Sequence, residues 1–191
     1  NFSAGLVWLV VSTYVYGYDK HNKITFENFE VLMPKEGKEI ITKDDFKIIE
    51  KEILHPFYDK LINENGYWTK ITLINYLENN NLINKNFEVI FCDEAQDFTK
   101  IELEFINSIS LYNNYNLSNV NQYPIVFAGD ALQTVNPTGF KSQVLTSMIY
   151  KSLTDPKIGF KLDSSDLTFT PKFNYRSSKS IVNLSNAIQN W

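Results

Sequence analysis

Two short apolar runs in the middle of the chain each end in acidic residues. Residues 87–91 lead into Asp93 and Glu94, and residues 124–128 lead into Asp130. Short runs of β-branched and aromatic residues predict strands that are buried in a parallel sheet. Because ligands bind at the carboxyl ends of the strands in open α/β sheets, this pattern predicts an α/β fold with acidic groups at its binding edge.

The segment from Thr42 to Leu61 has the periodicity of one amphipathic helix. Thr42 and Asp45 form the pattern of a capping box at its start. Pro56 is expected to kink the helix, and Gly66 is expected to end it. The apolar face of this helix is predicted to consist of Phe46, Ile49, Ile53, Phe57 and Leu61.

Shorter periodic segments predict further helices. Thr99 and Glu102 form a second capping-box pattern, directly after the first acidic run. Residues 6–16 are too short a run for periodicity to separate helix from strand, and a helix is the favoured interpretation. Tyr67 and Trp68 are interpreted as core anchors at the start of a helix. The remaining assignments are helices over 69–77, 141–153 and 179–191, a strand over 167–170, and a connector over 19–43.

The composition is typical of a soluble globular protein or a piece of one. The 191 residues are 43% hydrophobic and carry a net charge of -4, so they can bury one good core or two small ones. The longest apolar run, Leu6 to Val11, is too short to span a bilayer and does not follow the basic start of a signal peptide. We therefore expect a cytoplasmic location. The negative net charge argues against binding of nucleic acid by overall electrostatic attraction. Binding in a local basic groove stays an alternative.

The side chains favour a hard, oxygen-bound metal over zinc. A single cysteine, Cys92, excludes an intramolecular disulfide, and with two histidines it forms no zinc-ligand pattern. Two adjacent acids at a strand end have a use in phosphate chemistry, because Asp93 can hold Mg²⁺ and Glu94 can deprotonate a water for attack on a phosphate. The simpler interpretation is that these acids, with Asp97, only complement the dipole of the following helix.

Three stretches occur in one order along the chain and together resemble a known family. They are VIFCDEAQD over residues 89–97, GDALQTV over 129–135 and FNYRS over 173–177. These stretches resemble motifs II, III and IV of the UvrD/Rep class of superfamily I DNA helicases, which are P-loop NTPases. The resemblance implies a RecA-like parallel sheet, present in part, with a helical inserted subdomain. It assigns residues 1–85 to that helical accessory subdomain, 86–165 to the C-terminal part of the first RecA-like domain, and 166–191 to the start of the second.

The functional residues of this family fall on matching positions of the chain. By resemblance, Asp93 binds Mg²⁺, Glu94 activates the attacking water, and Gln133 contacts the γ-phosphate of ATP. Arg176 stabilises charge on the transferring phosphate from the second domain, and Tyr175 stacks on the nucleotide base. Simpler interpretations stay open: a loop amide for Gln133, a surface cation for Arg176 and a core aromatic for Tyr175. The resulting ATP-binding set is Asp130, Gln133, Tyr175 and Arg176, and the catalytic set is Glu94, Gln133 and Arg176.

The chain departs from the family pattern in two places. No Gly-x-x-x-x-Gly-Lys-Ser/Thr loop is present in the 191 residues. The family carries this loop ahead of the segment that resembles this chain, so we expect the chain alone not to hydrolyse ATP. The loop after Gln133 has no aromatic residue before Phe140, although stacking contributes roughly 1–3 kcal/mol per base of bound single strand. ATP hydrolysis is therefore better supported than strand unwinding.

Three functions follow as alternatives. The first is an ATP-dependent helicase or translocase that moves on single-stranded DNA. The second is a nucleotide switch that couples hydrolysis to a partner protein or a nuclease without unwinding. The third is a non-catalytic interaction module, in which residues 1–85 present a binding face. None of the three requires a membrane partner.

Overall fold

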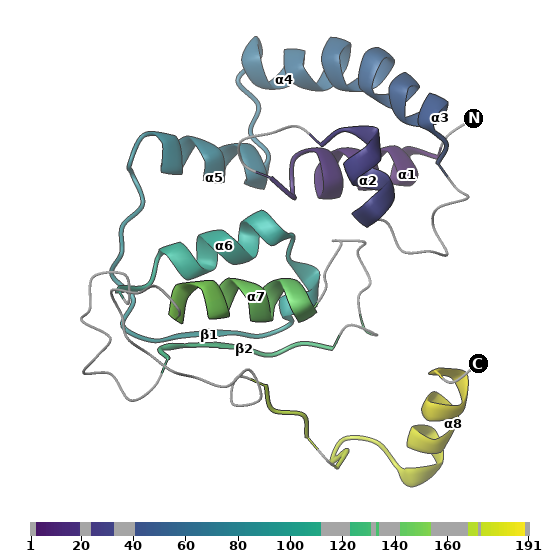
Figure 1. Cartoon of the computed structure of the whole chain (residues 1–191), viewed down its shortest axis with the longest axis vertical. Helices are drawn as coiled ribbons and strands as arrows, with labels where there is room; N and C mark the ends of the chain where they lie inside the picture. The colour runs from purple at the N-terminus through teal and green to yellow at the C-terminus, as the bar shows by residue number, and fades with distance from the viewer. Residues whose placement is uncertain are drawn as a thin grey trace. The chain divides into compact units, whose positions relative to one another are not determined.

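The chain folds as two compact units, residues 1–160 and 161–191. In the first unit most of the described residues are helical, and a small two-stranded parallel sheet makes the fold mixed α/β (Figure 1). In the described part of the chain, no helix is long and apolar enough to cross a membrane. The computed structural model describes residues 3–19, 24–32, 41–111, 123–130, 133, 142–153, 168–171 and 173–189.

Helices form the N-terminal half of the first unit. Three consecutive segments, α3 (Lys43–Ile48), η3 (Ile49–Asp59) and α4 (Lys60–Asn63), make up the long helix at the top of Figure 1. The same half contains α1 (Ala4–Leu9), η1 (Val10–Val15), α2 (Phe26–Leu32) and α5 (Lys70–Asn79). Buried residues of η1, α2, α3 and η3, with Ile24 and Ile41 from the links between helices, form one hydrophobic core of Val10, Val11, Tyr14, Val15, Ile24, Phe29, Ile41, Phe46, Ile49 and Leu54.

The predicted capping box at Thr42 is present, but the apolar face of the long helix differs from the prediction after Ile49. Leu54 is 1% exposed, whereas Phe57, predicted to be buried, is 58% exposed. The cause is that η3 is a π-helix, whose i→i+5 hydrogen bonds widen each turn and rotate the following residues. Tyr58, one position further on, packs against the core in place of Phe57. Pro56 lies inside this π-helical segment.

Two other predictions from the local sequence pattern were wrong, because contacts with distant residues determine the structure of these segments. Residues 19–43 were expected to be a connector, but α2 lies within them, and its Phe29 ring packs 5.1 Å from the ring of Phe46. A helix this short is marginal by itself and depends on such tertiary contacts. Tyr67 and Trp68 were expected to be core anchors, but they are 65% and 55% exposed. They lie in the link to α5, where Trp68 packs edge-on against Tyr76 at 5.0 Å.

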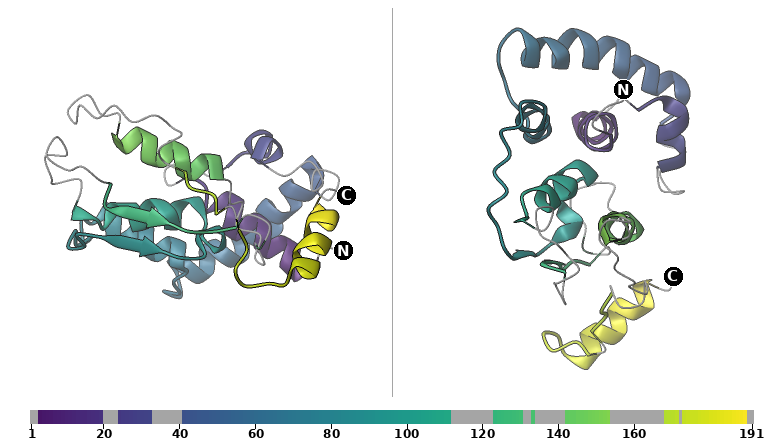
Figure 2. Two further views of the ribbon diagram at one scale, coloured as in Figure 1. Left: turned by 90° about the horizontal axis from the view of Figure 1, so that it is seen from below. Right: turned by 60° about the vertical axis from the view of Figure 1, so that its left-hand side comes forward.

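The sheet consists of β1 (Ile90–Cys92) and β2 (Ile125–Phe127), which run parallel as predicted. Two helices, α6 (Lys100–Ser108) and α7 (Ser142–Leu153), lie over one face of the sheet (Figure 2). On this face Cys92 and Leu103 are buried, with partly buried Phe127, Leu145 and Met148 against them. The strands were expected to be buried on both faces. That expectation was wrong, because Phe91 and Val126, which point away from the helices, are 78% and 49% exposed.

The second unit contains α8 (Lys179–Gln189), in agreement with the predicted C-terminal helix. The strand predicted over 167–170 is not formed at residues 168–170, which have no regular secondary structure. Phe169 in this stretch is 87% exposed. A strand needs a hydrogen-bonded neighbour, and the described residues of this unit include no other strand.

The replacement Gly17→Ala is expected to destabilise the first unit by roughly 1–3 kcal/mol. An added Cβ would lie 2.5 Å from the carbonyl oxygen of Ser12 and 2.7 Å from that of Thr13, so the backbone of η1 would have to move. Urea unfolding followed by circular dichroism measures the loss. Gly5→Ala is the matched control, because nothing lies within 4 Å of its Cβ and alanine favours the helix by up to about 1 kcal/mol. Equal stability of the two variants would contradict this packing.

Candidate functional site

The two acidic strand ends lie side by side at one edge of the sheet. Because β1 and β2 are parallel and in register, the residues after Cys92 and after Phe127 leave the sheet together. The pairing continues past both strands, since the Ala128 amide donates to the Cys92 carbonyl and the Ala95 amide donates to the Ala128 carbonyl, each at 2.8 Å. The structure therefore brings the segment of Asp93 and Glu94 next to the segment of Asp130.

Glu94 has an unusual backbone conformation. Its φ of 51° and ψ of 41° are left-handed, and its amide donates to Oδ1 of Asp93 at 2.9 Å. Among the described non-glycine residues only Asn81 shares a positive φ, and Asn81 follows helix α5, where asparagine commonly adopts this conformation. No such explanation applies to a glutamate. Strain of this kind costs of the order of 1–3 kcal/mol and is characteristic of functional sites.

Gln96 joins the two strand ends and was given no role by the sequence. Its side chain is 1% exposed. The Nε2 group donates to Oε2 of Glu94 at 2.6 Å, and Oε1 accepts from the backbone amide of Asp130 at 3.0 Å. The position of Gln96 within the acidic motif is visible in the sequence, but its partner on the second strand end is not.

Gly129 leaves the space that Gln96 occupies. A Cβ at this position would lie 2.6 Å from Oε1 of Gln96 and 3.2 Å from the backbone nitrogens of Ala95 and Gln96. A side chain at residue 129 would therefore push the glutamine away from the second strand end. A glycine directly before the acid of the second run is the sequence signal for this close approach.

Asp130 and Gln133 form a small turn at the same edge. The Gln133 amide donates to the Asp130 carbonyl at 2.9 Å, and Nε2 of Gln133 donates to Oδ2 of Asp130 at 2.8 Å. Both residues are exposed. Four of the residues singled out from the sequence, Asp93, Glu94, Asp130 and Gln133, thus belong to one hydrogen-bonded region of the first unit.

Tyr175 and Arg176 belong to the second unit, which is described by itself. Asn174 fixes their loop, because its Oδ1 accepts from the amides of Arg176 and Ser177, each at 2.9 Å. Tyr175 is 91% exposed within this structure, so the alternative of a core aromatic does not hold in the described part of its unit. Its ring lies 6.3 Å from that of Phe173.

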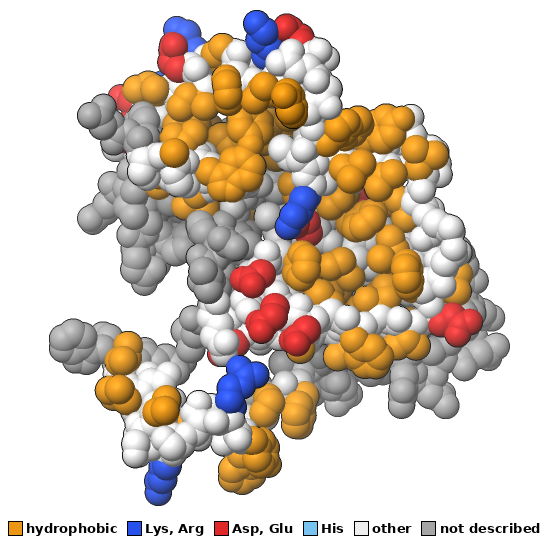
Figure 3. Space-filling model, turned by 180° about the vertical axis from the view of Figure 1, so that it is seen from behind, with side chains coloured by type: hydrophobic (Ala, Val, Ile, Leu, Met, Phe, Trp, Pro, Cys, Tyr) orange, Lys and Arg blue, Asp and Glu red, His pale blue; other side chains and the backbone are white. Residues whose placement is uncertain are grey.

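Asp93 is the residue at the strand ends that could hold a magnesium ion, with water or other oxygen atoms as the remaining ligands. In the described part of the chain, no group of three or more His, Cys, Asp or Glu side chains could hold a metal ion. Mg²⁺ is commonly bound by only one or two carboxylates, with water and phosphate oxygens as its other ligands. Asp93 is exposed, and its Oδ2 makes no hydrogen bond to the described residues. Figure 3 shows several Asp and Glu side chains close together near the middle of the face in view, and others at its top and right-hand edge.

Cys92, next to this edge, is a buried strand residue. Burial raises the pKa of its thiol, and the neighbouring Asp93 carboxylate raises that pKa further. Both effects keep the thiol protonated near neutral pH, where a protonated thiol is a poor nucleophile. Cys92 therefore supplies packing at the strand end.

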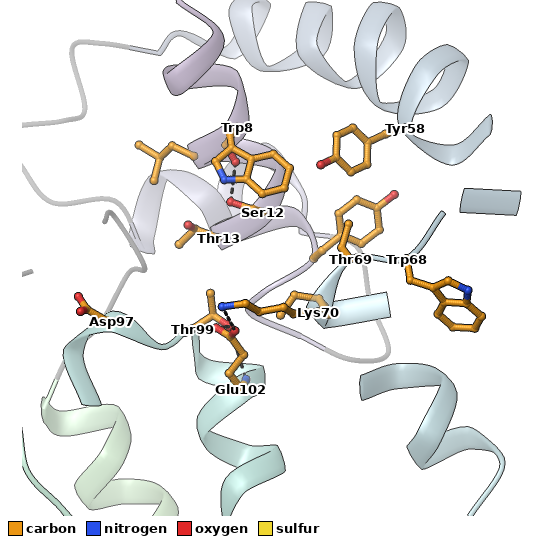
Figure 4. A pocket seen from close by; sticks show the side chains of 13 residues that line it. Trp8, Ser12, Thr13, Tyr58, Trp68, Thr69, Lys70, Asp97, Thr99 and Glu102 are labelled. Atoms are coloured by element: carbon orange, nitrogen blue, oxygen red, sulfur yellow. Dashed lines mark hydrogen bonds and ion pairs between the residues drawn. The ribbon is translucent and has the colours of Figure 1, made fainter. Parts of the chain in front are cut away.

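An open pocket of about 430 Å³ lies beside the N-terminus of α6, among residues of the helical half and of the acidic segment (Figure 4). Trp8 and Tyr58, on its upper side, have ring centroids 5.8 Å apart. Lys70 extends across the pocket, and its Nζ lies 3.6 Å from Oε1 of Glu102. Asp97, three residues after Glu94, lines this pocket together with Thr99.

Comparisons of this chain with protein-family models, with curated proteins and with solved structures return no match.

Proposed function

We propose that this chain carries the magnesium-binding and water-activating residues of a UvrD/Rep-type superfamily I DNA helicase or translocase. Such an enzyme couples ATP hydrolysis to movement on single-stranded DNA. One observation carries the proposal: parallel pairing of β1 with β2 puts the segment of Asp93 and Glu94 beside the segment of Asp130 and Gln133. In this family those two segments are motifs II and III, and both act on the phosphates of ATP.

The hydrogen bonds at the strand ends suit this chemistry. Oε2 of Glu94 is held by Gln96, whereas Oε1 makes no hydrogen bond to the described residues, so it can take a proton from an attacking water. Asp93 would hold the magnesium ion, which when bound supplies positive charge to the phosphate oxygens. Gln133, in the turn next to this edge, would contact the terminal phosphate.

The second unit contributes two further residues to the proposal. The loop that Asn174 fixes exposes Tyr175, and an aromatic face stacks on a nucleotide base without base-specific hydrogen bonds. Arg176, next to it, would stabilise charge on the transferring phosphate, as an arginine finger does. Phe140, the first aromatic residue after Gln133, lies outside the described residues.

A RecA-like sheet is proposed as the setting of this site. Parallel sheets in α/β proteins are covered on both faces, and here α6 and α7 cover one. The other face exposes Phe91 and Val126, which are adjacent in the sheet register. The proposed RecA-like setting therefore rests on the parallel pairing of β1 with β2 and on the one covered face.

ATP hydrolysis, measured with and without single-stranded DNA, tests the proposal. The sample is the native protein, by which we mean this chain together with any segments that precede or follow it. We expect magnesium-dependent hydrolysis that rises when single-stranded DNA is added, because movement on the strand is coupled to turnover. Hydrolysis that ignores nucleic acid would favour the nucleotide switch over the motor. Absence of hydrolysis under both conditions would overturn the proposed enzyme and leave the interaction module.

A further inference from the structure

The side-chain amide of Gln96 has a fixed orientation between the two strand ends. A backbone N–H can only donate, so the group that faces the Asp130 amide at 3.0 Å must be the carbonyl Oε1. The Nε2 group then points at Oε2 of Glu94, and an ionised carboxylate can only accept. The two contacts agree with each other, so the amide is held at both ends by partners of the required polarity.

Burial makes these two hydrogen bonds consequential. Gln96 is 1% exposed, and Gly129 lets it approach the second strand end closely. A buried amide that loses a partner pays the full cost of desolvation. Glu94, at the other end of the bond, has a strained backbone that only its surroundings can maintain. The glutamine therefore constrains the rotation of the Glu94 carboxylate.

The same glutamine connects Glu94 to the turn of Asp130 and Gln133. Its Oε1 accepts from the Asp130 amide, and the Asp130 carboxylate accepts from Nε2 of Gln133. A continuous series of hydrogen bonds thus leads from the first acidic segment to the second. A displacement of the turn would therefore move the Gln96 side chain and, through it, the Glu94 carboxylate.

We propose that Gln96 is a positioning residue, which holds the Glu94 carboxylate in place and makes its position depend on the Asp130–Gln133 turn. This inference rests on the proposed function, because it takes Glu94 as the group that activates water. Gln96 itself touches no reacting atom. Its effect is on the rate of hydrolysis, since misplacing a catalytic group slows the chemical step more than it weakens substrate binding.

Two substitutions in the native protein separate the two hydrogen bonds. Gln96→Met keeps the volume and removes both bonds. Gln96→Glu keeps an acceptor for the Asp130 amide but sets a carboxylate oxygen against Oε2 of Glu94. We expect kcat for ATP to fall roughly 10- to 100-fold in both variants, with KM little changed. We expect Gln96→Glu to be at least as slow as Gln96→Met, although it retains the bond between the strand ends.

A purely structural role predicts the opposite order, because Gln96→Glu disturbs the packing and the pairing of the strand ends less. A wild-type rate in Gln96→Glu would overturn the inference, and so would a change in KM without a change in kcat. Gln143→Glu is the matched control, since Gln143 is exposed on α7 and the same charge is introduced there. It is expected to hydrolyse ATP at the wild-type rate.

Hydrogen exchange of the Asp130 amide provides a readout that does not need activity. The amide is expected to be protected in the wild type and in Gln96→Glu, and unprotected in Gln96→Met. Rapid exchange in the wild type would overturn the inference even for an active enzyme. A Glu94→Gln variant distinguishes failure of the proposed function from failure of this inference. A wild-type rate of ATP hydrolysis in Glu94→Gln would contradict the proposed function. An inactive Glu94→Gln together with a wild-type rate in Gln96→Glu would contradict only the role of Gln96.

Discussion

Glu94→Gln is expected to lower kcat for ATP in the native protein by roughly 10²- to 10⁴-fold, the usual contribution of a general base. The amide that replaces the carboxylate cannot take a proton from water. It still offers an oxygen to Nε2 of Gln96, so the hydrogen bond at 2.6 Å in the wild type can be retained. KM for ATP is expected to change little, because binding of the phosphates does not depend on this proton.

Steady-state ATPase measurements on purified wild type and variant check this expectation. Glu88→Gln is the matched control, since Glu88 is exposed and lies in the segment that leads into β1. It removes the same charge at the other end of β1 and is expected to leave kcat unchanged. A Glu94→Gln variant that hydrolyses ATP at the rate of Glu88→Gln would remove Glu94 from the mechanism.

Phe29→Ala is expected to lower the free energy of unfolding of the first unit by roughly 3–5 kcal/mol. Phe29 is 1% exposed, and its ring centroid lies 5.1 Å from those of Tyr14 and Phe46 and 6.1 Å from that of Phe26. Removing the ring leaves a cavity between α2 and its neighbours η1 and α3, which the surrounding side chains can fill only in part. Urea unfolding, followed by circular dichroism, measures the loss.

Phe57→Ala is the control for Phe29→Ala, and it also tests the π-helical register. Phe57 is 58% exposed, and exposed substitutions usually change stability by no more than about 0.5 kcal/mol. A regular α-helix would instead bury Phe57 on the core face, and the two substitutions would then cost similar amounts. Similar losses in both variants would therefore contradict the register of η3.

Local signals in the sequence were sufficient for many elements of the fold. The capping boxes at Thr42 and Thr99 have both of their reciprocal hydrogen bonds, and the helix predicted from Thr69 begins with a third, formed with Thr72. These motifs involve residues three positions apart, so their chemistry is complete within the segment itself. The parallel direction of β1 and β2 was also predictable. Both runs end in acidic residues, and parallel strands bring their carboxyl ends to the same edge of a sheet.

Features that depend on distant contacts were not predictable in the same way. The π-helical turns of η3 displace Phe57 in favour of Tyr58, and no periodic pattern announces such a change of register. Helix α2 forms because Phe29 has a core to enter. Gln96 stands in the acidic motif, but its role depends on the backbone of Asp130 and on the missing side chain of Gly129. Each of these partners lies elsewhere in the sequence.

The contact of Gly17 with helix α6 has a consequence for the order of folding. The Ile101 amide, in the first turn of α6, donates to the Gly17 carbonyl at 3.1 Å. Thr99 and Glu102 form the reciprocal hydrogen bonds of the capping box within the segment itself. The hydrogen bond of the Ile101 amide can form only after the N-terminal segment has packed against α6. Contacts between residues so far apart in the sequence form late and slowly. The helical half and the sheet half of the first unit are therefore expected to complete folding in one cooperative step.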